Sequence, residues 1–201
     1  MNNRDRIIEE AALLFRTYGI RSVTMDMLAN KMGISKRTIY ELFRDKDELL
    51  EGVLKWMTDK QKEIVTKITY ESGNVIEAIF KVLDFMRVHL EKMSPAFLLD
   101  IRKYRHRMLN IIDGKDEIEF FGFNEDIIRK GIEQGIFRNE LEVKIIRKCL
   151  FEIGKMSDVA DLSVDDEFMR KDVMMNIFIN YLKGISTPKG LELINKLEIN
   201  I

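Results

Sequence analysis

A short stretch near the N-terminus concentrates side chains that can bind phosphate and read base edges. Residues 21–44 hold five basic side chains against two acidic ones, whereas the whole 201-residue chain has 33 basic and 34 acidic residues. Because phosphate contact needs local positive charge and not a positive total, this stretch predicts a surface for nucleic acid. The polar side chains that we expect to be exposed on it are Ser35, Lys36, Arg37, Thr38, Tyr40, Glu41 and Arg44.

The spacing of small and apolar residues places these side chains on the second helix of a helix-turn-helix. Ala29 must be small because that helix crosses close over it, Gly33 must turn the chain with a positive φ, and Ile39 must fill the angle between the helices. The exposed face of such a helix fits the major groove of duplex DNA. A solvated helical hairpin whose charges have no role is the alternative. The positions that we expect to be buried are Leu28, Ala29, Met32, Gly33, Ile34, Ile39 and Leu42.

Capping residues predict short, sharply turned helices around this motif. Apolar residues recur at three- and four-residue spacing over residues 4–18, and Gly19 follows where a left-handed residue ends a helix. Three polar side chains then stand where N-caps are needed, and each offers an oxygen to the first backbone N–H groups of a helix. The predicted N-caps are Thr24, Ser35 and Asp45, the last with Glu48 in the spacing of a capping box.

Over residues 7–50 the sequence resembles the tetracycline-repressor-like (TetR) family of bacterial regulators. The family pattern has a threonine at the start of its second helix, a Gly-Val-Ser turn and a Thr-Leu-Tyr segment. An aromatic residue follows three positions after that tyrosine, and a lysine opens the fourth helix. The residues that match this pattern are Thr24, Gly33-Ile34-Ser35, Thr38-Ile39-Tyr40, Phe43 and Lys46.

The resemblance implies roles in DNA binding for the matching side chains. The implied phosphate contacts are Thr24, Tyr40 and Lys46, the implied groove-facing residues are Lys36, Arg37 and Thr38, and Phe43 is the implied core anchor. The chain departs from the family pattern at Arg37, where glycine or alanine is common, and at Leu42, where histidine or tyrosine is often found. We expect the fork of Arg37 to bind a guanine or a phosphate. Glu41 either accepts from a cytosine amino group or points away, and we favour the second.

Beyond Asp45 the apolar pattern predicts long helices and no convincing strand, so the expected fold class is all-α. We divide the chain into a helix-turn-helix DNA-binding domain over residues 1–46 and a helical domain over residues 47–201. The resemblance implies that the second domain binds a ligand and dimerises. The final stretch from residue 187 is left open between a short packed helix and a frayed tail. The predicted helices are 46–70, 74–92, 95–109, 115–134, 140–160 and 165–183.

Apolar stretches in the second domain indicate helices that need partners. Residues 173–182 are apolar nearly all round, and such a helix must be covered on every side. The resemblance implies that the last two long helices pair with those of a second copy, which gives a homodimer with two half-sites about one DNA turn apart. A purely intramolecular core is the alternative. The implied interface residues are Cys149, Ile153, Met156, Met174, Phe178 and Tyr181.

The central helices are rich in soft and aromatic side chains. The chain has twelve methionines and twelve phenylalanines, which suit an adaptable pocket for a small-molecule effector and equally suit an ordinary core. The basic run at residues 102–107 either receives an anionic effector or forms a solvated helix face. The predicted ligand-lining residues are Phe85, Phe97, Tyr104, Phe121 and Met156.

Several function classes are disfavoured by what the sequence lacks. It has no nucleophile elbow, no phosphate-binding glycine loop and no His-Glu-x-x-His motif, so we expect no enzyme activity, no cofactor and no metal site. Cys149, the single cysteine, cannot form an internal disulfide, and no signal core or membrane-spanning stretch is evident, so we expect a cytoplasmic protein with no membrane partner.

Together these observations predict a homodimeric transcriptional regulator that responds to an unknown small-molecule effector. We expect it to be a repressor that binds a palindromic operator in double-stranded DNA. An adaptor that uses its helix-turn-helix for protein contacts is the alternative.

Overall fold

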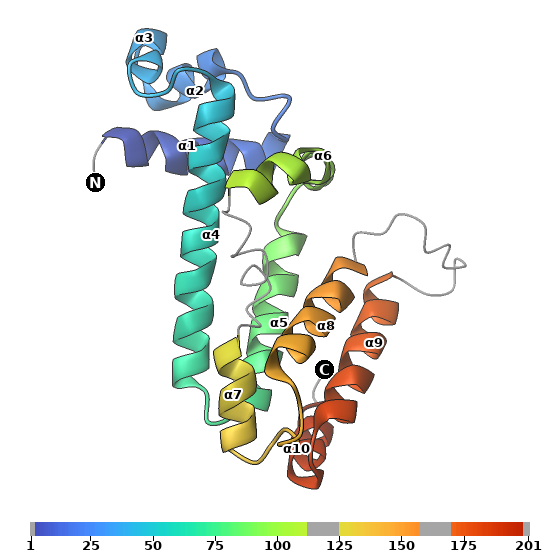
Figure 1. The fold of residues 1–201 in the computed structure, drawn as a ribbon. Helices are drawn as coiled ribbons and strands as arrows, with labels where there is room; N and C mark the ends of the chain where they lie inside the picture. The colour runs from blue at the N-terminus through green and yellow to red at the C-terminus, as the bar shows by residue number, and fades with distance from the viewer. Residues whose placement is uncertain (1–2, 112–124, 157–169, 199–201) are drawn as a thin grey trace. The chain divides into compact units, whose positions relative to one another are not determined.

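The structure, a computed structural model, describes residues 3–111, 125–156 and 170–198. Within these ranges the regular elements are helices, and the β-type pairing is an isolated antiparallel bridge between Phe137 and Ser186 (Figure 1). The all-α prediction is therefore confirmed. The helices are α1 (Asn3–Tyr18), α2 (Met25–Met32), α3 (Lys36–Tyr40), α4 (Lys46–Glu71), α5 (Val75–Glu91), α6 (Pro95–Ile111), α7 (Glu125–Glu133), α8 (Val143–Met156), α9 (Arg170–Ile185) and α10 (Pro188–Glu198).

The helices predicted at 46–70, 74–92 and 95–109 are confirmed within two residues at each end. Residues 112–124 and 157–169 lie outside the described ranges, and so do the start of the helix predicted at 115–134, the end of that at 140–160 and the start of that at 165–183. The C-terminal stretch that the sequence left open is helical. Pro188 takes the first helical position, where its missing N–H is harmless, and the backbone N–H of Gly190 donates to Thr187 Oγ1 at 3.3 Å.

The chain divides into two compact units, each with its own hydrophobic core. The first consists of Met1–Glu63 and Phe85–Glu117, and the second of Ile64–Asp84 and Ile118–Ile201. Helices α4 and α5 therefore contribute residues to both units. The functional division at residue 46 stays a prediction.

The first core forms where α1, α2, α3 and the start of α4 bury their apolar faces, and α6 completes it. Phe15 of α1, Ile39 of α3 and Phe43 are fully buried, and Phe97 of α6 packs into the same cluster. The chain just before α6 is fixed to the end of α1, because Ser94 N–H donates to the carbonyl of Arg16 at 2.9 Å. The start of α6 is thus part of the unit that holds the helix-turn-helix.

A close approach between α6 and the turn after α1 requires glycine. Gly19 has a φ of 85°, which L-residues with a side chain rarely adopt. A Cβ built there would lie 3.0 Å from the Ala96 Cβ and 3.2 Å from Asp100 Oδ2. The predicted left-handed stop of α1 is confirmed, and it also makes room for α6.

The second core joins α5, α7, α8, α9 and α10 around one remote contact. Thr187 N–H donates to the Ile136 carbonyl at 2.9 Å, and Arg138 N–H donates to the Ile185 carbonyl at 3.0 Å. Phe137, between Ile136 and Arg138 in sequence, is fully buried. Its ring contacts Gly131 so closely that a Cβ there would collide with it. We call residues 134–138 together with 185–190 the clasp.

Candidate nucleic-acid interface

Helix α2 begins and ends as its sequence predicts. Thr24 has extended backbone angles, and its Oγ1 accepts from the backbone N–H of Met27 at 3.1 Å, so one of the free N–H groups of the first turn is satisfied. At the other end Gly33 has a φ of 66°, and the next N–H, that of Ile34, donates to the Ala29 carbonyl at 3.1 Å. The N-cap and the glycine turn are both confirmed, but the expected burial of Gly33 is wrong, because the turn lies at the surface and Gly33 is exposed.

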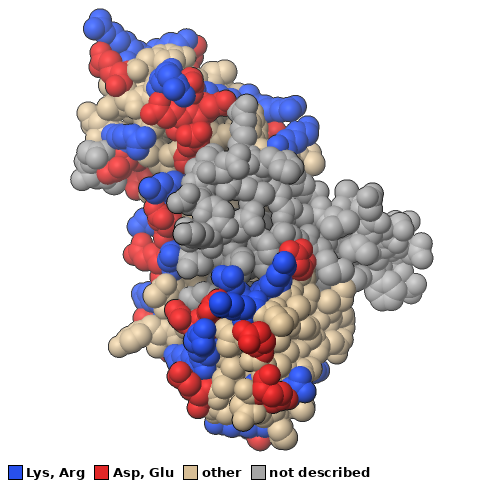
Figure 2. All heavy atoms as spheres, in the orientation of Figure 1, with Lys and Arg blue, Asp and Glu red and all other residues tan. Residues whose placement is uncertain are grey.

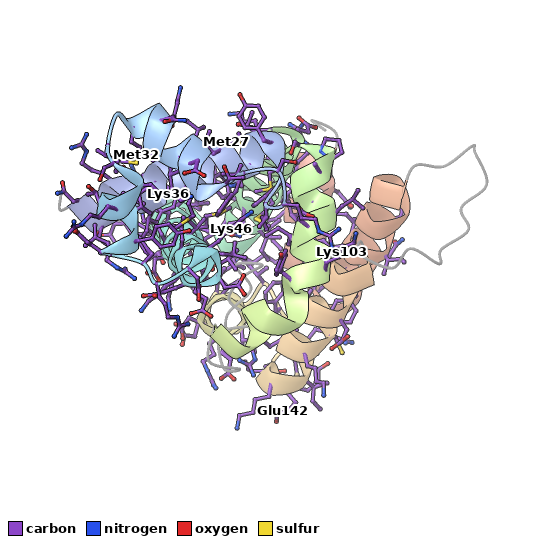
Figure 3. All side chains as sticks on the ribbon, turned by 90° about the horizontal axis from the view of Figure 1, so that it is seen from above. Met27, Met32, Lys36, Lys46, Lys103 and Glu142 are labelled. Carbon is purple, nitrogen blue, oxygen red and sulfur yellow. The ribbon has the colours of Figure 1, made fainter. Side chains whose placement is uncertain are left out.

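Helix α3 is short, and its two faces differ sharply. Ser35 Oγ accepts from the backbone N–H of Thr38 at 3.1 Å and shares a second hydrogen bond with the Thr38 hydroxyl at 2.8 Å. Ile39 is fully buried, which fixes how the helix is rotated. The same helix consequently leaves Lys36, Arg37 and Tyr40 exposed, with Glu41 and Arg44 exposed just after it. Lys36 and Met32 are labelled in Figure 3, close to the turn between α2 and α3.

Helix α4 starts with a modified capping box. Asp45 Oδ1 accepts from the Glu48 N–H at 2.8 Å, while the Glu48 carboxylate accepts from the N–H of Arg44 at 2.9 Å, one residue before the cap. The hydrogen bond from the Glu48 backbone, assisted by one from the Arg44 side chain, holds the pKa of Asp45 below its usual value. The predicted cap is confirmed, with its return bond shifted by one residue.

The exposed cations of this surface are each bonded to a carboxylate. Lys36 Nζ donates to Asp26 Oδ2 at 2.9 Å, and Arg37 Nε donates to Glu41 Oε1 at 3.0 Å. Arg44 Nε donates to Asp45 at 3.1 Å. The bond to Asp26 raises the pKa of Lys36 above its usual value. Positive and negative side chains accordingly alternate over the upper part of the face shown in Figure 2.

Lys46 points its ammonium group into the protein. Its Nζ donates to the carbonyls of Val23 and, at 3.4 Å, of Arg21, and it lies 6.0 Å from the centroid of the Phe15 ring. Burial lowers the pKa of Lys46, although the nearby Asp100 carboxylate acts in the opposite direction. Lys46 thus holds the turn between α1 and α2, the segment that leads into Thr24.

Asp100 of α6 holds the same turn from another side. This buried carboxylate accepts from the Arg21 backbone N–H at 3.0 Å, and the Arg21 Nε lies 3.6 Å from its other oxygen. Sequence reasoning missed Asp100, because 79 residues separate it from Arg21 and no local pattern marks a carboxylate that caps a remote turn. An isolated acidic residue on the apolar side of α6 was the one available signal.

Comparison with known proteins agrees with this geometry. Residues 7–53, which span α1 to the first turns of α4, match the model for bacterial regulatory proteins of the tetR family. The repressor KstR2 of Mycolicibacterium smegmatis is 24% identical over 170 residues, which cover 74% of each chain. A TetR transcription regulator from Haloarcula marismortui has a similar fold, with a TM-score of 0.70 at 17% identity over 92% of this chain and 98% of the other. Residues 7–53 thus resemble the DNA-binding part of the TetR family, and the described helices have the fold of solved TetR regulators.

Another structural neighbour shows what a protein of this fold can hold. It is a protein from Saccharomonospora viridis, described as a transcriptional regulator and crystallised in complex with choline. Its TM-score is 0.58 at 17% identity, over 91% of this chain and 96% of that one. In the part of this chain that the structure describes, no helix is both long and apolar enough to cross a membrane.

The predicted effector residues of this chain lie in different surroundings. Phe97 is fully buried in the first core, whereas Phe85 and Tyr104 are half-buried. Phe85 stacks on His89 with ring centroids 5.5 Å apart. Phe121 and the side chain of Met156 lie outside the described residues. An effector role for these side chains stays a prediction.

The predicted interface residues lie on α8 and α9, which pack against each other. Cys149, Ile153 and Tyr181 are half-buried, while Phe178 belongs to the second core. Burial, followed by a hydrogen bond with Cys149, raises the pKa of Tyr181 well above its usual value. The side chains of Met156 and Met174 are outside the described part, and the interface itself stays a prediction.

Proposed function

We propose that this chain is a homodimeric repressor that binds an inverted-repeat operator through α3 and is released by a small-molecule effector in the cytoplasm. The observation that carries the proposal is the opposition of the two faces of α3. Ile39 fixes one face in the first core, and Lys36, Arg37 and Tyr40 stand exposed on the other. A short exposed helix held in this way is suited to the major groove.

The proposed DNA contacts fall into two groups. Lys36, Arg37 and Thr38 lie at the start of α3, the part of a reading helix that meets base edges. Thr24 and Tyr40 flank them, one at the N-terminus of α2 and one at the end of α3, where hydroxyl groups can bind phosphate oxygens. Ser35, Glu41 and Arg44 complete the proposed surface.

A second copy of the chain would cover α8 and α9. Ile145 of α8 is 60% exposed, and Cys149 and Ile153 follow it at four-residue intervals on the same side of the helix. Half-buried Tyr181 of α9 bonds to Cys149. An apolar stripe of this kind supports an isologous interface, which also supplies the two-fold symmetry of an inverted repeat.

The effector would act through the difference in its affinity for two arrangements of the chain. The complex of the Saccharomonospora viridis protein with choline supports a small-molecule site in this fold. Helix α4 contributes to both compact units. We therefore propose that occupancy near Phe85 and Tyr104 changes α4 and with it the spacing of the two reading helices. The repressor assignment is supported by the name of KstR2.

Selection of randomised duplex DNA by the purified full chain tests the proposal. We expect an enriched inverted repeat that is lost when Tyr40→Ala and Arg37→Ala are combined, because two exposed contacts of α3 are removed. Tyr70→Ala is the matched control, since Tyr70 is 87% exposed on α4 and outside the proposed surface. A single unrepeated motif would contradict the dimer. Absence of any enrichment, with or without cell extract as a source of effector, would favour the adaptor function.

Sedimentation equilibrium tests the dimer separately. Ile145→Glu places a charge on the exposed apolar stripe of α8 and should convert dimers to monomers. Lys144→Glu, one residue away on an exposed position, should leave the mass unchanged. A dimer that tolerates Ile145→Glu would place the interface elsewhere.

A further inference from the structure

We propose that Asp26 and Glu41 are specificity-determining residues that weaken binding to DNA outside the operator. The inference rests on the proposed DNA-binding function. The two carboxylates partner the two cations of α3, Lys36 and Arg37, and so place negative charge within the surface that would meet DNA.

The two carboxylates come from different elements of the motif. Asp26 comes from the first turn of α2 and bonds Lys36 across the helix-turn-helix, ten residues away in sequence. Glu41 directly follows α3 and bonds Arg37 along the same helix face. All four side chains are largely exposed, at 49% and 61% for Lys36 and Asp26 and 88% and 59% for Arg37 and Glu41.

The charge of the whole motif is nearly balanced in consequence. Residues 21–48 contain six basic and five acidic side chains. Two of these acidic residues cap a helix: the Asp45 and Glu48 carboxylates accept hydrogen bonds from backbone N–H groups at the start of α4. Within the described residues, the hydrogen bonds of the Asp26 and Glu41 carboxylates go to the side chains of Lys36 and Arg37 and not to backbone N–H groups.

Exposed ion pairs are weak, so phosphate can take either cation away from its carboxylate. The carboxylate then remains well within a Debye length of the DNA backbone, where its repulsion from phosphate is only partly screened. This repulsion is the same for every sequence. It therefore lowers the sequence-independent part of the affinity, which comes from phosphate contact.

The operator can offset this repulsion where other sequences cannot. The amino group of cytosine is the base-edge donor that carboxylates accept from in the major groove. Although the sequence favoured a Glu41 that points away, its bond to Arg37 keeps it on the exposed surface at the end of α3. A cytosine placed opposite Asp26 or Glu41 would give the carboxylate a hydrogen bond, whereas a guanine or thymine oxygen would face it with another acceptor. The carboxylates thereby increase the ratio of operator binding to non-operator binding.

Binding of the full chain to two duplexes tests the inference. One is the repeat obtained by selection and the other a scrambled duplex of equal length and composition. Asp26→Asn and Glu41→Gln preserve shape and remove the charge. We expect each to tighten binding to the scrambled duplex about fivefold, the effect of one like-charge contact through water, and to lower the operator-to-scrambled ratio.

Two matched controls separate position from net charge. Asp59→Asn and Glu63→Gln make the same charge change on exposed positions of α4, and Glu63 is also the partner of an exposed cation, Lys60, at 3.0 Å. They lie about 20 and 25 Å along the helix from its start. We expect both to leave the ratio of the two affinities unchanged.

Three outcomes would overturn the inference. Unchanged affinity of Asp26→Asn and Glu41→Gln for the scrambled duplex would remove their effect on non-operator binding. An equal gain in the controls would assign the effect to net charge. A wild-type chain that binds neither duplex at low salt would overturn the proposed DNA binding itself, and this result is distinguishable from the other two.

Discussion

The helix-turn-helix and the clasp close their turns by opposite means. In the helix-turn-helix the caps of α2, α3 and α4 each join residues three positions apart, from Thr24, Ser35 and Asp45. In the clasp, Thr187 Oγ1 donates to the Gly135 carbonyl at 2.8 Å and Lys189 Nζ donates to the Gln134 carbonyl at 2.7 Å, across 52 and 55 residues. The helix-turn-helix is therefore held by hydrogen bonds between residues close in sequence, and the clasp by hydrogen bonds between residues far apart in sequence.

This difference predicts how much a substitution in each region should lower stability. A lost cap frees one backbone N–H and leaves the surrounding core intact. A damaged clasp separates segments that nothing local brings together, and its buried centre, Phe137, is among the largest fully buried side chains of the described residues. Substitutions in the clasp should therefore have larger effects on stability than substitutions at the caps.

Removal of the Phe137 ring is the strongest test of this contrast. Phe137→Ala should lower the free energy of unfolding by about 3–5 kcal/mol, because it leaves a cavity in a close-packed core. Urea denaturation followed by circular dichroism measures the loss. Phe137→Leu retains most of the volume and should lose less than half as much. A loss from Phe137→Ala no larger than that of a cap variant would contradict the contrast.

Substitution of Lys46 should have an intermediate effect on stability, because this residue stabilises the turn between α1 and α2 through hydrogen bonds to residues more than twenty positions away. Lys46→Met keeps the apolar stem and removes the ammonium group from the carbonyls of Arg21 and Val23. We expect a loss of about 1.5 kcal/mol, the low end for a charged donor, since burial of the charge opposes the bond.

The salt dependence of operator binding shows whether Lys46 acts through the turn or through phosphate. A turn-holding role predicts an unchanged slope, whereas a lost phosphate contact would reduce the slope by about 0.9. Lys31→Met is the matched control for stability, because Lys31 is an exposed lysine of α2. Equal losses in the two variants would show that the bonds of Lys46 are not stabilising.

The cap of α2 should have a smaller effect. Thr24→Ala should lower stability by about 1 kcal/mol, as typical N-caps do, and should speed hydrogen exchange at the Met27 N–H that Thr24 now binds. Thr24→Ser retains the hydroxyl and should behave like the wild-type chain. Slow exchange at Met27 in the alanine variant would mean that another group caps the helix.

The smallest expected effect is a pH dependence in the first unit. Burial, with the charges of Arg16 and Lys92, lowers the pKa of His89 below 6.5 in the folded chain. The unfolded chain then binds more protons than the folded one as the pH falls through 6.5, so stability should decrease until the folded pKa is passed and stay constant below it. Thermal unfolding of the wild-type chain and His89→Gln between pH 8 and 5 isolates this contribution. Parallel curves would contradict it.

The same contrast explains what sequence alone could predict. The all-α fold, the caps and the buried Ile39 follow from patterns within a few residues, and the structure confirms them. The clasp and the bond between Asp100 and Arg21 join residues more than forty positions apart, so no local pattern marks them. Ion pairing of Lys36 with Asp26 was also missed, because the prediction treated the exposed cations as unpartnered.

The docking of α6 on the turn at Gly19 has a consequence for how such genes can be recombined. The unit that carries α3 is not one continuous segment of the sequence, since Phe97 and Asp100 enter it from residues 85–117. A chimaera that joins residues 1–63 of this chain to the remainder of a relative would bring a foreign α6 against Gly19 and Arg21. Exchange of operator preference between relatives should therefore succeed when α6 travels with its own helix-turn-helix.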